Sequence, residues 1–199
     1  MSLLLITIGA SLMPFLSLFG QSALVGGDMR YVMANVAGFM GMTCLTWQMV
    51  LGTRYVKTKL TGKAGDLIRV HMLLGIWGMF FILLHPLLEM MTYQSIFIPT
   101  LATTLGTYVL YGQMAFALII MVWITSAWYR NKMPRKVWYA IHLSSYPMML
   151  LMFFHAPRIG RFLHSVVWVQ MYWFALLVIY AVAATTRIFA LFVPSKKTL

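Results

Sequence analysis

The sequence predicts an all-α membrane protein, a bundle of six transmembrane helices. Hydrophobic residues make up 62% of its 199 residues and charged residues only 9%, whereas a soluble domain has about a quarter of its residues charged. Six apolar stretches come close to the roughly 20 residues that a transmembrane helix needs. These stretches are residues 2–20, 31–52, 67–92, 105–128, 137–157 and 165–189. Because the connections are short and hold no linker or repeat, we expect one domain over residues 1–199.

Each apolar stretch is best explained as a helix. Backbone polar groups within lipid must be satisfied inside one helix or in a closed barrel, and these runs are too long for barrel strands. The first stretch, "MSLLLITIGASLMPFLSLFG", lacks the positively charged start of a signal peptide, so we expect it to be a retained span. Cys44 is the single cysteine, so the sequence has neither an internal disulfide nor a C-x-x-C-H haem-attachment motif.

The distribution of lysine and arginine predicts the orientation. Twelve basic residues fall on one side of the predicted spans and three on the other, which places both termini in the cytoplasm. The twelve are Arg54, Lys57, Lys59, Lys63, Arg69, Arg130, Lys132, Arg135, Lys136, Arg187, Lys196 and Lys197; the three are Arg30, Arg158 and Arg161. Cytoplasmic loops therefore explain the net charge of +12, and no basic face for nucleic acid is indicated.

Four of the five histidines lie within the predicted spans. His71 and His85 are fourteen residues apart on the third span, and His142 and His155 are thirteen apart on the fifth. Fourteen helical residues advance about 21 Å and return to within about 40° of the starting direction. His71 and His85 therefore face one way, near opposite sides of the bilayer. Because both spans run outward, His142 matches His71 in depth and His155 matches His85.

Two imidazoles at one depth, repeated about 20 Å away, are typical of two stacked b-type haems. A b-type haem binds a neutral imidazole on each face of its iron, and its apolar macrocycle fits between helices. Gly75 and Gly78 lie on the stripe that joins His71 to His85. We expect them to let a flat cofactor approach the backbone, although small residues also serve helix packing.

One spacing fits this pattern badly. Thirteen residues on a straight helix leave the His155 ring about 140° away from the His142 direction. Pro147 lies between them, and we expect a proline kink to repair part of the mismatch. His164 is a rival outer ligand, but we expect it to contact a haem propionate, an acceptor or water from the loop before the last span.

The histidines are also compatible with roles that involve no haem. A single buried histidine often packs or relays protons, so a histidine-based proton or metal transporter is the alternative from a different class. A transition-metal channel normally adds carboxylates or cysteines at close spacing, and here only Glu89 follows His85 by one turn. The eighteen methionines are interpreted as adaptable core residues rather than iron ligands.

The segments "LLGIWGMFFILLHPLLE" and "RKVWYAIHLSSYPMMLLMFFH", with these histidine spacings, resemble the ferric reductase-like transmembrane family. That family includes the membrane domains of NADPH oxidases and iron reductases and the haem subunit of a bacterial periplasmic methionine sulfoxide reductase. The resemblance covers roughly residues 31–189. It implies an inner haem b held by His71 and His142 and an outer haem b held by His85 and His155.

The resemblance implies a transmembrane di-haem cytochrome of a bacterial inner membrane. Unlike the oxidases, the chain ends at "FVPSKKTL", and no G-x-G-x-x-G motif follows a strand. We therefore expect an electron-transfer or oxidoreductase subunit supplied by a separate cytoplasmic flavoprotein or a membrane quinol. The acceptor is expected on the outer face. Alternatives are a haem subunit of a periplasmic oxidoreductase and a quinol-oxidising cytochrome b, although the 57-residue step from His85 to His142 favours the ferric reductase-like plan.

Charged residues near the expected haems could serve either the cofactor or the topology. Arg54 and Arg69 could pair with propionates of the inner haem, and Arg158 and Arg161 with those of the outer haem. They could equally be ordinary charges that set the topology. Glu89 could orient an outer acceptor or a proton, or lie at the wet end of its helix.

Overall fold

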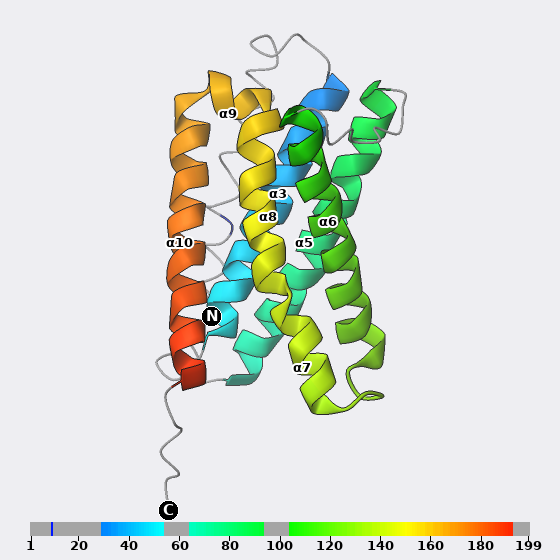
Figure 1. Ribbon diagram of the computed structural model, residues 1–199, viewed down its shortest axis with the longest axis vertical. Helices are drawn as coiled ribbons and strands as arrows, with labels where there is room; N and C mark the ends of the chain where they lie inside the picture. The colour runs from blue at the N-terminus through cyan, green and yellow to red at the C-terminus, as the bar shows by residue number, and fades with distance from the viewer. Residues whose placement is uncertain (1–8, 10–28, 54–63, 94–103, 193–199) are drawn as a thin grey trace, which may run out of the picture.

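The computed structural model describes residue 9 and residues 29–53, 64–93 and 104–192, and all regular structure in these ranges is helical. The helices form a bundle in which the long elements run roughly along one axis (Figure 1). The elements are α3 (Met29–Gly52), α5 (Ala64–Tyr93), α6 (Thr104–Ile124), the π-helical turn η3 (Thr125–Tyr129), α7 (Arg135–Leu143), α8 (Ser145–Ile159), α9 (Arg161–Ser165) and α10 (Val167–Phe192).

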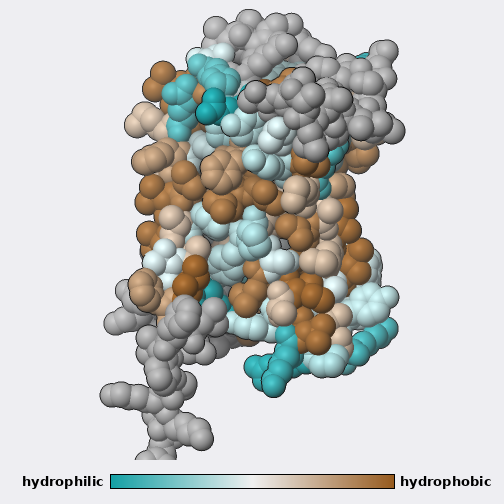
Figure 2. All heavy atoms as spheres, viewed as in Figure 1, coloured by the Kyte–Doolittle hydropathy of each residue, from teal (hydrophilic) through white to brown (hydrophobic). Residues whose placement is uncertain are grey.

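Four helical segments of the described residues are long and apolar enough to cross a membrane. They are Asp66–Met91, Leu105–Tyr129, Arg135–Ile159 and Val167–Phe189, and they coincide with four of the six predicted spans. These segments make the chain a multi-pass membrane protein. Large apolar side chains such as Trp77, Phe174 and Phe189 are exposed on the bundle, and apolar residues cover much of the face seen in Figure 2. Such a surface is suited to lipid.

The residues of the second predicted span form the helix α3, which is long enough to cross a membrane but less apolar than the four candidate segments. It carries the polar residues Asn35, Thr43 and Thr46, all of them buried. Each bonds to a backbone carbonyl one turn back in α3, at 2.8–2.9 Å, so the polar atoms are satisfied within the helix. The predicted first span, residues 2–20, lies outside the described residues apart from Gly9.

The bundle is built from two closely packed helix pairs. α5 packs along α3, α8 packs along α6, and α10 covers another side of α3. α5 and α8 show no comparable packing on each other, although both carry paired histidines. The space between the two pairs is therefore bridged by side chains rather than by close backbone contact.

The two glycines expected beside a cofactor instead serve the packing of α5 on α3. A Cβ at Gly75 would lie 2.5 Å from the Gln48 side chain, and one at Gly78 would lie 2.9 Å from Leu45. Both neighbours belong to α3. The expectation that these positions face a flat cofactor is therefore wrong, because the stripe they share points at the partner helix.

Gly41 of α3 provides a test of this close packing. A Cβ there would lie 2.8 Å from the Ile82 side chain and 3.2 Å from the Ile82 backbone nitrogen, which cannot move alone. We expect Gly41→Val to lower the free energy of unfolding by about 1–3 kcal/mol, seen as a lower midpoint of thermal unfolding in detergent. Ala181→Val, on the exposed side of α10, is the matched control and should change stability by less than about 0.5 kcal/mol.

Candidate functional site

Four histidines face each other in two pairs across the space between the helix pairs. The ring centroids of His71 and His142 are 6.4 Å apart, and those of His85 and His155 are 6.5 Å apart. The first pair includes His142 of α7, and we call it the α7-end pair. The second includes His155 near the end of α8 that leads to α9, and we call it the α9-end pair. Figure 1 shows α7 and α9 at opposite ends of the bundle. The structure thus brings together the residues that the sequence matched by depth.

Three of the four rings are oriented by a backbone carbonyl of the helix against which their own helix packs. The Nδ1 atom of His71 lies 2.9 Å from the Gln48 carbonyl oxygen, and that of His85 lies 2.8 Å from the Ala34 carbonyl oxygen. His155 makes the same bond at 2.8 Å to a carbonyl of α6. A carbonyl oxygen only accepts, so each Nδ1 carries the proton and donates it. The lone pair then stays on Nε2, the nitrogen that a metal would bind.

Each of these carbonyls is followed four residues later by a glycine. The pairs are Ala34 with Gly38, Gln48 with Gly52, and Tyr108 with Gly112. In a helix the residue at i+4 donates to the carbonyl at i, so a ring that shares the carbonyl lies against residue i+4.

A side chain at these glycines would crowd the histidine rings to different degrees. A Cβ at Gly38 would lie 3.1 Å from His85 Nδ1, one at Gly52 would lie 3.7 Å from His71 Cε1, and one at Gly112 would collide with the His155 ring. These three glycines were not predicted from the sequence. The sequence does contain a signal for two of them, because Gly38 and Gly52 are fourteen residues apart, which is also the spacing of His71 and His85.

His142 is oriented differently from the other three. Its Nδ1 lies 3.3 Å from the hydroxyl oxygen of Ser126, in the π-helical turn η3 at the end of α6. A π-helical turn often lies at a functional site because its extra residue re-aims neighbouring side chains. The indole of Trp138, one turn earlier on α7, stacks on the His142 ring with centroids 4.9 Å apart and planes 18° apart.

A helix break between the two histidines of the fifth span accounts for their thirteen-residue spacing. α7 ends at Leu143, and α8 begins after a turn at Ser144. The Ser144 amide donates to the Ile141 carbonyl at 3.0 Å, three residues back, whereas an α-helical amide donates to the carbonyl four residues back. Pro147 lacks the amide that would bond to the Leu143 carbonyl, so the discontinuity falls before the proline and not at it. The break lets both rings face α5, which a straight helix would not allow.

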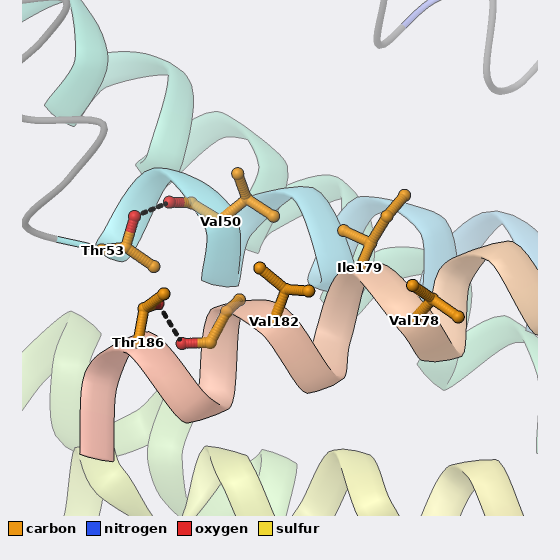
Figure 3. Close-up of a pocket in the computed structure, with 7 residues that line it drawn as sticks. Val50, Thr53, Val178, Ile179, Val182 and Thr186 are labelled. Atoms are coloured by element: carbon orange, nitrogen blue, oxygen red, sulfur yellow. Dashed lines mark hydrogen bonds between the residues drawn. The ribbon is translucent and has the colours of Figure 1, made fainter. Parts of the chain in front are cut away.

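A groove lies between α3 and α10 (Figure 3). Its volume is about 260 Å³, and its lining is almost entirely apolar. The hydroxyl group of Thr53, the residue after α3, donates to the Val50 carbonyl at 2.7 Å, and that of Thr186 donates to the Ala183 carbonyl at 2.9 Å. Neither hydroxyl proton is therefore directed at a ligand, so these two hydroxyl groups do not select a polar head group.

The model of the family described as "ferric reductase like transmembrane component" matches residues 37–153. The chain belongs to this family. The matched region includes His71, His85 and His142 and ends two residues before His155. No curated protein sequence matches the chain closely enough to count as a relative.

Members of the ferric reductase-like family typically bind haem, and the paired histidines fit that group. The bond from a metal to an imidazole nitrogen is about 2 Å long, and the ring centre lies roughly 1 Å further. Two imidazoles that bind one metal from opposite sides would therefore have their ring centroids about 6 Å apart. Among the described residues, no group of three or more His, Cys, Asp or Glu side chains could hold a metal ion. A pair of ligands suits a metal whose other bonds come from a macrocycle.

The remaining site candidates from the sequence are not ring partners of the two histidine pairs. Arg158 is exposed, with its guanidinium carbon 5.6 Å from the ring centroid of Tyr108, the residue whose carbonyl orients His155. Arg69 is also exposed, and Glu89 is half-buried one turn beyond His85. His164 is exposed on α9 and belongs to neither pair. Of the two other arginines, Arg54 lies outside the described residues and Arg161 is described only as part of α9.

Proposed function

We propose that this protein is a transmembrane b-type cytochrome that carries electrons across the membrane through two haems. The observation that supports this most directly is the pair of facing imidazole sites, with ring centroids 6.4 and 6.5 Å apart. Fourteen residues of one continuous helix, α5, separate His71 from His85, which corresponds to about 21 Å. Two sites at that separation would divide the crossing of an apolar layer of about 30 Å into shorter steps.

The residues of each site have distinct tasks. His71 and His142 would bind the iron of an inner haem, and His85 and His155 that of an outer haem. Haem b at each pair would supply reversible one-electron chemistry of iron. The carbonyl acceptors behind His71, His85 and His155 hold the rings in the tautomer that presents Nε2. Such bonds also raise the basicity of the ligand, which favours the oxidised metal.

The direction of transfer that we propose rests on the charge distribution. Basic residues gather at the α7 end, including Arg130, Lys132, Arg135 and Lys136, and this favours a cytoplasmic location for that end. With the predicted first span and α3 added to the four apolar segments, the chain would cross the membrane six times with both termini inside. Electrons would enter at His71 and His142 from a separate cytoplasmic flavoprotein or a membrane quinol. They would leave from His85 and His155 to an acceptor on the outer, periplasmic face.

Arginines near the two histidine pairs in the sequence would pair with haem propionates. Arg69 lies one turn or less from His71 on α5, and Arg158 lies three residues after His155 on α8. A guanidinium group is suited to a carboxylate because it offers several donors in one plane. Arg158 also contacts Tyr108, which ties it to the helix that orients His155.

The proposal is tested by haem content and spectrum. Protein purified in mild detergent after expression with ample haem supply should contain two equivalents of protohaem per chain by pyridine haemochrome assay. Its reduced-minus-oxidised spectrum should show the bands of bis-imidazole haem b. A histidine-based proton or metal transporter, the alternative from a different class, would show no haem bands. Substantially fewer than two equivalents would overturn the two-haem arrangement.

A further inference from the structure

The indole nitrogen of Trp138 is a buried donor without a partner. Trp138 Nε1 is the one buried side-chain nitrogen or oxygen atom among the described residues that makes no hydrogen bond. An unpaired buried N–H group is costly, because it has lost its bond to water and gained none in return. Such an atom in a native protein indicates an acceptor that the described residues do not provide.

Trp138 lies directly beside the α7-end pair. Its ring is stacked on the His142 ring, with a centroid separation of 4.9 Å. The guanidinium carbon of Arg130 lies over the same indole, 5.9 Å from its centroid. A donor N–H group and a cation therefore meet next to one candidate iron ligand.

The side chains around the Trp138 indole favour an anionic acceptor for its N–H group. The carboxylate side chains of the described residues are Asp66 and Glu89, both on α5, and neither accepts a bond from Trp138. Neighbouring side chains along the chain are basic, namely Arg130, Lys132, Arg135 and Lys136. A carboxylate brought by a ligand would satisfy the indole donor and the positive charge together, and bonds between an N–H group and an anion are the stronger class of hydrogen bond.

We propose that Trp138 Nε1 donates a hydrogen bond to a propionate carboxylate of the haem held by His71 and His142, with Arg130 supplying the counter-charge. This inference rests on the proposed function, because it requires a haem at that pair. Trp138 is then a positioning residue with two effects. Its stacked ring fixes the rotation of the His142 imidazole, and its N–H group orients the haem edge.

The bond also affects the reduction equilibrium of that haem. A propionate charge near the iron favours the ferric state, and a donor or cation on the propionate offsets that charge. Removing the donor should therefore make the inner haem harder to reduce. The reduction equilibrium constant is expected to fall about three- to tenfold, which is less than the full contribution of a hydrogen bond to a charged group because the bond is present in both oxidation states.

The test compares Trp138→Phe with Trp128→Phe in purified protein whose haem propionate carboxylates carry ¹³C. Phenylalanine keeps a ring against His142 but has no N–H group. Trp128 is the matched control, because its indole is 58% exposed on η3 and its ring contacts Trp123, with centroids 5.2 Å apart. The measurements are haem content, the midpoint potentials of both haems and the redox-difference infrared bands of the labelled carboxylates.

The expected result is specific to one haem. Trp138→Phe should retain two haems, lower the midpoint potential of one of them and shift the labelled carboxylate bands, whereas Trp128→Phe should match the wild type. A changed potential with unchanged labelled bands would overturn the inference, because the acceptor would then be a lipid phosphate or water. Unchanged potentials and bands would overturn it also.

A second variant keeps the inference testable if Trp138→Phe loses the inner haem. Arg130→Gln leaves the indole in place and should shift the same labelled bands and lower the same midpoint potential. If the labelled bands of Arg130→Gln are identical to those of the wild type, the inference that Trp138 and Arg130 contact the same carboxylate is wrong. Wild-type protein without haem would instead contradict the proposed function, so the two failures are distinguishable.

Discussion

Alanine in place of His71 is expected to reduce the haem content of the purified protein from two equivalents to one, and alanine in place of His142 to do the same. Each variant removes one of the two imidazoles that face each other 6.4 Å apart. A haem at that pair would then be held by one histidine instead of two and would lose much of its affinity. Pyridine haemochrome assay and the reduced-minus-oxidised spectrum measure the loss.

The same reasoning applies to the α9-end pair, with a different consequence for transfer. His85→Ala and His155→Ala should each spare the inner haem but stop the delivery of electrons to an external acceptor. Reduction of the inner haem by a chemical donor on the cytoplasmic side of proteoliposomes should be retained. Reduction of an impermeant acceptor outside should be lost. Persistent transfer without the outer haem would contradict passage through two haems in series.

His164→Ala is the matched control for these four variants. His164 is exposed on α9 and belongs to neither pair, so the variant should keep two haems and normal transfer. The two variants of one pair should also remove the same haem. Variants of His71 and His142 that remove different haems, judged by the midpoint potential of the haem that remains, would refute the pairing.

Gly112→Ala is expected to remove the outer haem while leaving the bundle folded. The added Cβ would collide with the His155 ring, which can relieve the contact only by leaving the Tyr108 carbonyl. Loss of a hydrogen bond that orients a metal-binding histidine typically costs about 10- to 100-fold in metal affinity. Titration of haem into protein produced under haem limitation measures that affinity.

The chain offers a graded series of controls for this substitution. A Cβ at Gly38 would approach His85 to 3.1 Å, and one at Gly52 would approach His71 only to 3.7 Å. Gly38→Ala should therefore weaken the outer haem less than Gly112→Ala does, and Gly52→Ala should have no effect on either haem. A loss of haem from Gly52→Ala equal to that from Gly112→Ala would show that ring clearance is not the cause.

Much of the fold could be predicted from the sequence because span length and apolar content are local properties. Predicted boundaries such as 105–128 and 137–157 agree closely with the apolar segments Leu105–Tyr129 and Arg135–Ile159. The turn at Ser144 was not predicted, because a proline in the sequence does not show which neighbouring hydrogen bond will break. The first predicted span stays a prediction, since residues 2–20 are outside the described residues apart from Gly9.

By itself, the sequence determined the helical class and the matched depths of the four histidines, because helical rise and the apolar spans place residues along an axis whatever their neighbours are. Only the tertiary structure decided how each ring is held. The bond from His85 to the Ala34 carbonyl joins residues 51 apart in the chain, and that from His155 to Tyr108 joins residues 47 apart. The glycines that clear the rings and the unpaired indole nitrogen of Trp138 likewise acquire their roles only when separate helices meet.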